Sequence, residues 1–191
     1  MFYKMFNALS AALIAAACGS AVGAELSPVY VGADVGTQFS HNSSLVRAYA
    51  GYNVGGNTLF GLQQTHGVEV MLFTLGTETK TVRFFDYGYA GGNPVRASGI
   101  GINWSTALKL DDKWSLTGRL GGNYAWASTS YRYGADSDTY ARGGVTADVG
   151  VAYKLNPNVS LTVDVSYMPI RLNRYEKNTK PTLGTGLRYN F

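Results

Sequence analysis

The residues that could carry chemistry in this 191-residue chain are charged side chains that stand singly among Gly, Ala, Ser and Thr. Nine of them share one face of a strand-like alternation: Asp34, Arg47, Glu69, Lys109, Arg119, Asp148, Lys154, Asp164 and Arg188. Four are acidic and five are basic, so the set is almost neutral. Charges removed from water persist when they are paired, which favours an internal ion-pair network. The same residues could instead line a narrow, gated pore.

A catalytic interpretation has less support from the sequence. The two histidines are His41 and His66, and the stretch 41–44 places a His close to two Ser residues. A Ser/His/acid site depends on mutual geometry that closeness along the chain does not supply, and a lipid A deacylase would carry these groups on a lipid-facing strand. We therefore predict no catalytic residue and keep a lipid A-modifying enzyme as the third alternative. Two His without a thiolate argue against a metal site, and we predict no cofactor.

The elements that position the charges are eight segments in which apolar and small or polar residues alternate, as in half-buried β-strands. They are Val29–Gly36, Val46–Val54, Val68–Thr74, Gly99–Leu110, Trp114–Trp126, Val145–Leu155, Val159–Tyr167 and Leu183–Phe191. A soluble β-sandwich would alternate in the same way. However, its polar face would carry Lys, Glu and Gln, whereas small residues predominate here. Small residues suit the crowded interior of a narrow barrel.

Aromatic residues at the strand ends and unequal connections point to a membrane. The aromatics form two groups, Tyr52, Trp114, Tyr153, Tyr189 and Phe191 at one set of ends and Tyr124, Trp126 and Tyr167 at the other. The links 110–114 and 155–159 are tight, whereas 75–97, 128–144 and 168–182 are long and polar. Two aromatic girdles, short turns and long loops are typical of outer-membrane barrels. The link Gly55–Thr65 is irregular, because its residues 59–62 could extend the second or the third strand.

These features predict an all-β fold, an eight-stranded antiparallel up-and-down transmembrane β-barrel with short periplasmic turns and long extracellular loops. The strands must close into a ring, because an open sheet edge in hydrocarbon would leave backbone groups without hydrogen-bond partners.

The N-terminus predicts export. Residues 1–24 combine Lys4, the apolar run 8–17 and a stretch of small residues ending at Ala24, which together are typical of a secretory signal peptide. We predict cleavage after Ala24 and one barrel domain over residues 25–191; lipoprotein processing at Cys18 is the alternative. Cleavage removes one of 16 basic residues and none of the 12 acidic ones, which leaves a net charge of +3. Without a run of Lys or Arg, we predict no nucleic-acid partner.

Several stretches resemble the OmpA-like outer-membrane barrel family, whose eight-stranded transmembrane domain this chain would represent. The resemblance rests on residues 30–33, 51–53, 119–122, 143–145 and 152–157 and on the aromatic C-terminus 187–191. It implies that interior acids and bases pair, with Glu69 and Lys109 at suitable positions. It also implies that Leu187, Tyr189 and Phe191 form the signal read by the barrel-insertion machinery. Ala152 and Thr162 stand where family members can carry Glu and Arg. We expect no peptidoglycan-binding domain, since none follows Phe191.

The resulting functional prediction is an integral outer-membrane protein of a Gram-negative bacterium with a structural or surface-interaction role. A narrow channel for ions or small solutes is the runner-up. The expected partners are outer-membrane lipid and lipopolysaccharide, the insertion machinery, and an unidentified extracellular ligand of the loops; we predict a monomer. Aromatic and basic residues in 80–89, 131–133 and 171–180 suit either such a ligand or lipopolysaccharide phosphates.

Overall fold

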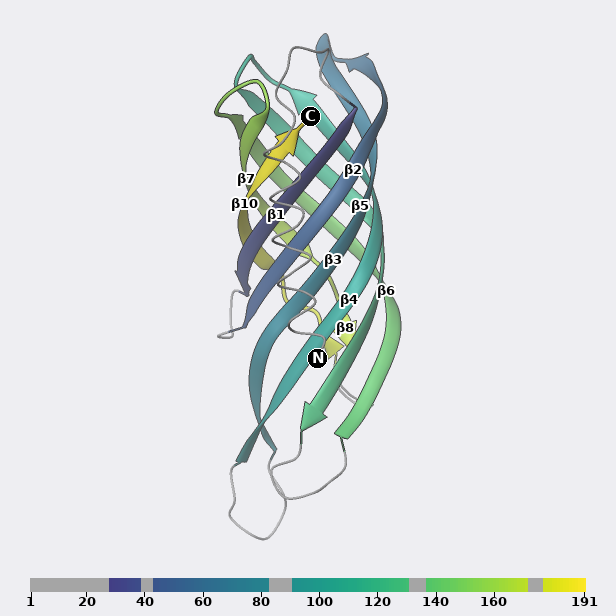
Figure 1. The fold of residues 1–191 in the computed structure, drawn as a ribbon, viewed down its shortest axis with the longest axis vertical. Helices are drawn as coiled ribbons and strands as arrows, with labels where there is room; N and C mark the ends of the chain where they lie inside the picture. Colours follow the sequence, from purple (N-terminus) through teal and green to yellow (C-terminus); the bar gives the residue numbers. More distant parts are fainter. Residues whose placement is uncertain (1–27, 39–42, 83–90, 131–136, 172–176) are drawn as a thin grey trace.

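The computed structural model describes residues 28–38, 43–82, 91–130, 137–171 and 177–191. These residues form a closed antiparallel barrel with the ring order β1-β10-β7-β6-β5-β4-β3-β2 (Figure 1). The predicted eight-stranded barrel is therefore confirmed. Its strands are β1 (Val29–Gln38), β2 (Ser44–Leu59), β3 (Leu62–Val82), β4 (Gly91–Lys109), β5 (Trp114–Ser130), β6 (Ser137–Lys154), β7 (Val159–Tyr167) and β10 (Thr182–Asn190). A separate small sheet pairs β8 (Ile170–Arg171) with β9 (Lys177–Asn178).

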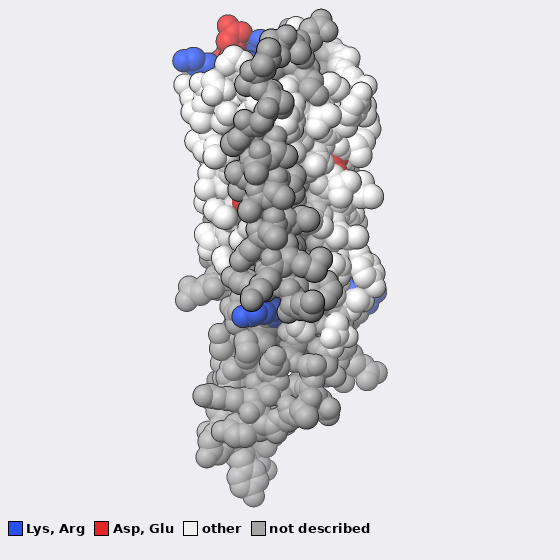
Figure 2. Space-filling view, in the orientation of Figure 1, with Lys and Arg blue, Asp and Glu red and all other residues white. Residues whose placement is uncertain are grey.

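The alternation in the sequence becomes the inside and outside of the barrel, because successive side chains of a strand point to opposite faces. On the outer face, Ile102 and Leu120 are 63% and 62% exposed, whereas Asp34 on the inner face is 3% exposed. Most of the visible wall in Figure 2 is uncharged, and charged side chains stand mainly toward its upper and lower edges. Within the described residues, no helix is long and apolar enough to cross a membrane.

The two ends of the barrel differ. We call the end that carries the connections 60–61, 110–113 and 155–158 the turn end; it is at the top of Figure 1. The opposite end, which carries the links from β1 to β2, β3 to β4, β5 to β6 and β7 to β10, is the loop end.

The irregular link at Gly55–Thr65 is a continuation of both neighbouring strands. After a register shift between Asn53 and Gly55, β2 and β3 stay paired as far as Leu59 and Leu62. Phe60 and Gly61 form the turn, with φ of 53° and 80°. Positive φ at both central residues is the twist that suits a two-residue hairpin. The extra residue in β2 explains why period two alone did not fix this register.

The strands at the loop end are longer than the alternation predicts. β3 and β4 pair as far as Val82 and Gly91, and β5 and β6 as far as Ser130 and Ser137. Much of 75–97 and 128–144, predicted as loop, is therefore strand. The physical reason is that the apolar pattern records contact with lipid, whereas backbone pairing between neighbouring strands can continue beyond it.

Candidate functional site

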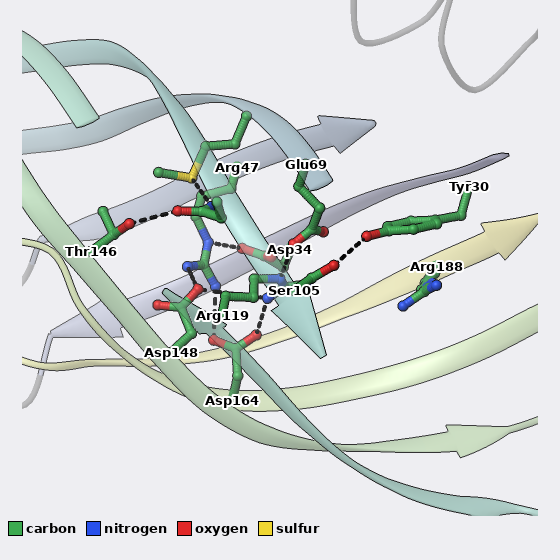
Figure 3. A network of polar contacts seen from close by, with 12 residues as sticks. Tyr30, Asp34, Arg47, Glu69, Ser105, Arg119, Thr146, Asp148, Asp164 and Arg188 are labelled. Atoms are coloured by element: carbon green, nitrogen blue, oxygen red, sulfur yellow. Dashed lines mark hydrogen bonds and ion pairs between the residues drawn. The ribbon is translucent and has the colours of Figure 1, made fainter. Parts of the chain in front are cut away.

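Arg47 lies at the centre of the barrel interior and binds three carboxylates at once (Figure 3). Its Nε donates to Asp34 Oδ1 at 2.7 Å, Nη1 to Asp148 Oδ2 at 2.8 Å, and Nη2 to Asp164 Oδ1 at 2.7 Å. All four side chains are almost completely buried. A guanidinium has five donors in a planar fork, so one Arg can satisfy three acids that approach from different strands.

A second guanidinium extends this arrangement into one connected network. Arg119 Nε donates to Glu69 Oε1 at 2.8 Å, and its Nη1 lies 3.6 Å from both Asp148 Oδ2 and Asp164 Oδ2. Asp148 and Asp164 therefore face both arginines. We call these six residues, namely Asp34, Arg47, Glu69, Arg119, Asp148 and Asp164, the ion-pair network.

The barrel topology explains which of these contacts are local. Asp34 stands opposite Arg47 in the β1–β2 register, and Arg119 stands opposite Asp148 in the β5–β6 register. The other strong contacts cross the lumen, from β2 to β6 and β7 and from β5 to β3. On β10, Gly184 leaves room for the Arg47–Asp164 ion pair, since a Cβ there would lie 3.1 Å from Asp164 Oδ1. The network thus ties together strands that do not touch around the ring.

The network carries more acid than base, with four carboxylates around two guanidiniums. Each acid uses one oxygen for its close contact, and Asp34 Oδ2, Asp148 Oδ1 and Glu69 Oε2 have no hydrogen-bond partner. This differs from the almost neutral set of nine expected from the sequence. Among the described residues no cluster of His, Cys, Asp or Glu is arranged to hold a metal ion. The three aspartates instead converge on a guanidinium.

Two buried tyrosines lie on the turn-end side of Arg47. Arg119 Cζ is 4.5 Å from the centroid of the Tyr49 ring, and Arg188 Cζ is 3.5 Å from that of Tyr30. The Tyr30 hydroxyl also shares a hydrogen bond of 2.7 Å with Ser105 Oγ. Cations over aromatic rings attract the ring quadrupole, the more so when water is excluded. This aromatic layer separates the ion-pair network from the turn end.

The rings need glycines opposite them. Tyr30 stands opposite Gly51 and Tyr49 opposite Gly32 in the β1–β2 register. A Cβ on either glycine would collide with the facing ring. The small residues that identified the inner face in the sequence therefore create the space that two large side chains fill.

An apolar layer lies on the loop-end side of the network. Its wall consists of buried inward-facing residues from four strands, namely Leu45, Phe73, Leu75, Ala97, Ala125 and Ala127. Between this wall and the ion-pair network, Thr146 Oγ1 donates to Asn103 Oδ1 at 2.6 Å. The lumen is thus filled in successive aromatic, ionic, polar and apolar layers.

Three of the nine predicted interior charges lie outside the ion-pair network. Lys109 pairs with Asp112 of the adjacent turn, Nζ to Oδ1 at 3.1 Å, and is half-exposed, so the arrangement with Glu69 implied by the family resemblance is not present. Lys154 is exposed. Arg188 lies over Tyr30. Lys109 and Lys154 share the parity of the inner face, but they stand at strand ends, where the interior opens to water.

The predicted girdle aromatics do not all stand at strand ends: Trp114 begins β5 and Tyr167 ends β7, whereas Tyr52 lies within β2 and Tyr124 and Trp126 within β5. Tyr52, Trp114, Tyr124, Trp126 and Tyr167 are between 40% and 53% exposed. Tyr153, Tyr189 and Phe191 are partly covered, since Trp114 packs on Tyr153 and Tyr189 on Phe191 with ring centroids 4.8 and 5.1 Å apart.

The candidate nucleophile stretch is only partly described. His41 lies outside the described residues, and Ser43 is buried with no hydrogen-bond partner for its Oγ. His66 contacts Asn57, Nε2 to Oδ1 at 3.2 Å, and lies beside the Trp104 ring. Most of the aromatic and basic stretches at 80–89, 131–133 and 171–180 also lies outside the described residues.

Comparisons place this geometry among known barrels. The family model described as the outer membrane protein beta-barrel domain matches residues 8–191. The crystal structure of Neisserial surface protein A aligns with a TM-score of 0.60 and 18% identity, over 88% of this chain and 100% of that one. A major outer membrane protein from Thermus thermophilus aligns with a TM-score of 0.51 and 14% identity, over 85% and 98%. A de novo designed transmembrane β-barrel gives 0.51 and 13%, over 89% and 100%. No curated protein matches the chain by sequence.

Proposed function

The chain belongs to the outer membrane protein beta-barrel domain family, and from this premise we propose that it is a closed barrel whose role is structural or interactive rather than conductive or catalytic. An outer-membrane barrel lies in lipid along its apolar belt. In this proposal the turn end faces the periplasm and the loop end faces the outside. The protein would anchor the loop end at the cell surface, where a ligand or lipopolysaccharide would contact it.

The observation that carries the proposal is the Arg47 cluster. Arg47 spans the lumen between β2 on one side and β6 and β7 on the other, with three N–O distances of 2.7–2.8 Å. A barrel of eight strands is just wide enough for its own side chains. With Arg119 beside Arg47, both guanidiniums and four carboxylates occupy the same cross-section. An ion that passed through would have to break several buried ion pairs.

Biogenesis follows from the same proposal. Residues 1–24 would be removed on export, and Leu187, Tyr189 and Phe191 would be read by the insertion machinery. Phe191 N donates to Val29 O at 3.2 Å, so the signal residues lie beside the start of β1. The protein would act as a monomer.

Single-channel recording tests the closed lumen. Protein purified from the outer membrane of an expressing bacterium is placed in a planar bilayer beside its Glu69→Ala and Arg119→Ala variants. Folding of each is checked by heat-shifted gel mobility. Lys109→Ala is the matched control, because Lys109 pairs with an exposed turn residue outside the network.

A folded but silent wild type supports the proposal. Discrete openings in the wild type that Glu69→Ala and Arg119→Ala alter, and Lys109→Ala does not, would overturn it. Those openings would establish the channel alternative, with the ion-pair network as pore lining.

A further inference from the structure

The chain that follows β7 turns into the mouth of the barrel. Met168 and Ile170 are 6% and 2% exposed, and Pro169 between them is buried. Ile170 begins β8, which lies against β5 and β6 and pairs with β9. The sequence predicted this stretch as part of a long polar loop at the surface. We propose that Met168–Ile170 is a stopper that seals the loop end of the lumen, so that displacing it opens the ion-pair network to water from that side.

The barrel wall is shaped to receive this segment. Ala97, Ala125 and Ala127 are buried on the inner faces of β4 and β5, whereas the larger Leu45 and Leu75 come from β2 and β3. Met168 and Ile170 belong to the same buried apolar cluster as these residues. Small residues on one side of an interior leave volume that close packing requires another group to fill. Two apolar side chains from the β7–β10 link supply that group.

One glycine permits the close approach of the backbone. Gly144 is on the inner face of β6, and a Cβ there would lie 2.9 Å from the carbonyl oxygen of Pro169. Since that atom is backbone, a side chain at position 144 would push the segment away rather than rotate a neighbour. Gly143, the adjacent residue, faces outward, and a Cβ there would meet Asn123 O at an ordinary 3.5 Å. The two glycines therefore provide a matched pair of positions.

The stopper lies between the ion-pair network and the loop end of the barrel, so it can keep water from the network. On β5 the inward residues run from Arg119 in the network through Asn123 to Ala125 and Ala127 at the loop end. The apolar layer thus stands between the charges and the outside. A dry apolar constriction resists wetting and the passage of ions. It also keeps the ion pairs in a low-dielectric interior, where they are strong.

Cysteine accessibility tests the stopper separately from conduction. Ser166 is 1% exposed, points inward two residues before Met168, and stands opposite Asp148. A Ser166→Cys reporter is treated, in purified protein held in lipid nanodiscs, with a small charged methanethiosulfonate reagent. The protein without an introduced Cys is the blank. Thr139→Cys, at an exposed position of the loop end, gives the rate for open access.

The expected result is slow modification of Ser166→Cys alone and an increase of at least about tenfold when Gly144→Leu displaces the segment, because the rate follows the population of the opened state. Gly143→Leu should leave the rate unchanged. Ile170→Ser gives the same test by removing the apolar side chain itself, should Gly144→Leu not fold. Heat-shifted mobility establishes that each variant has folded.

Two outcomes overturn the stopper. One is a Ser166→Cys reporter that reacts as fast as Thr139→Cys without any second substitution. The other is a reporter that stays protected in every folded displacing variant. The inference rests on the proposed closed lumen, but the two fail differently. An open mouth with a silent bilayer refutes the stopper alone, whereas wild-type openings refute the closed lumen.

Discussion

Arg47 Nη1 donates to Asp148 Oδ2 at 2.8 Å across the barrel, although the two residues are 101 positions apart in the chain. The contact joins β2 to β6, which are not neighbours in the ring. Together with the Arg47–Asp34 and Arg47–Asp164 contacts, it makes one side chain the meeting point of four strands. Stability should therefore depend on Arg47 far more than on any lysine at the barrel rim.

Replacing Arg47 by Met should destabilise the folded barrel by about 3–5 kcal/mol, because it leaves buried carboxylates without their cation. The stability of Arg47→Lys should lie between that of the wild type and that of Arg47→Met. An ammonium keeps the charge, but it cannot reach three acids as the guanidinium fork does. Lys109→Met should cost about 0–1 kcal/mol, as for exposed pairs. Urea unfolding in lipid vesicles measures all three. Equal losses for Arg47→Met and Lys109→Met would contradict this assignment.

The glycines opposite the buried tyrosines should not tolerate a methyl group. Gly51→Ala places a Cβ into the Tyr30 ring and Gly32→Ala one into the Tyr49 ring, so each should cost about 1–3 kcal/mol, as overpacking does. Gly55→Ala is the control, since a Cβ there meets nothing within 4 Å. The same urea titration compares them. If Gly51→Ala is as stable as Gly55→Ala, the ring does not lie across the glycine.

Two turns of like geometry should differ in their dependence on pH. Asp111 Oδ1 accepts hydrogen bonds from Lys113 N and Trp114 N, both at 2.7 Å. These amides lower the pKa of Asp111 below its ordinary value of 3.8. Because the folded pKa is depressed, the carboxylate stabilises the turn above that value and loses this effect as the pH falls through the folded pKa.

Asn156 provides the matched turn that does not titrate, since its Oδ1 accepts from Asn158 N at 2.9 Å and from Val159 N at 2.8 Å. Hydrogen exchange, corrected for intrinsic rates, should show protection of the Trp114 amide falling in acid while that of Val159 holds. Asp111→Asn should abolish the difference. Parallel behaviour of both amides in the wild type would refute the role of Asp111.

In the hairpin between β2 and β3, Phe60 has a strained backbone conformation that a substitution could relieve. Phe60 has a φ of 53° and is 92% exposed, so its ring gains little from packing within the chain. Asn adopts this left-handed conformation more readily than Phe. Phe60→Asn should therefore stabilise the barrel by up to about 1 kcal/mol. Gly61→Ala, at a φ of 80°, should destabilise it. Thermal unfolding decides, and a destabilised Phe60→Asn would show that the ring makes a contact that matters for folding.

A period of two residues identifies the inner face well, because one face of each strand contacts lipid and the other faces the lumen. The alternation places Asp34, Arg47 and Asp164 on the inner face, where the structure has them. The sequence does not predict their partners across the lumen. Closing the ring brings together residues from distant strands, and no periodic spacing in the sequence marks such pairs. The alternation marks the link at Gly55–Thr65 as irregular but does not locate the bulge near Asn53, and it underestimates the length of β3, for a related reason. The hydropathy pattern indicates which residues contact lipid, but it does not predict how far two strands stay paired beyond the lipid.

The segment at Met168–Ile170 shows the same limit from the other direction. Its apolar residues are few and lie in a polar stretch, so no periodicity marks them as interior. The available signal is the group of small residues at Ala97, Ala125 and Ala127, which implies an unfilled volume once β4 and β5 are known to be neighbours with these residues on the inner face.

The seam of the barrel sets the earliest point at which the ring can close. β1 pairs with β10 along nine residues of each strand, from Tyr30 with Asn190 to Gln38 with Thr182. The first strand to leave the ribosome must therefore wait for the last before its outer edge is covered. Contacts so distant in sequence form slowly, and unpaired strand edges invite aggregation meanwhile. Until Asn190 is available to pair with Tyr30, the exposed edge of β1 must be kept from pairing with other unfolded chains.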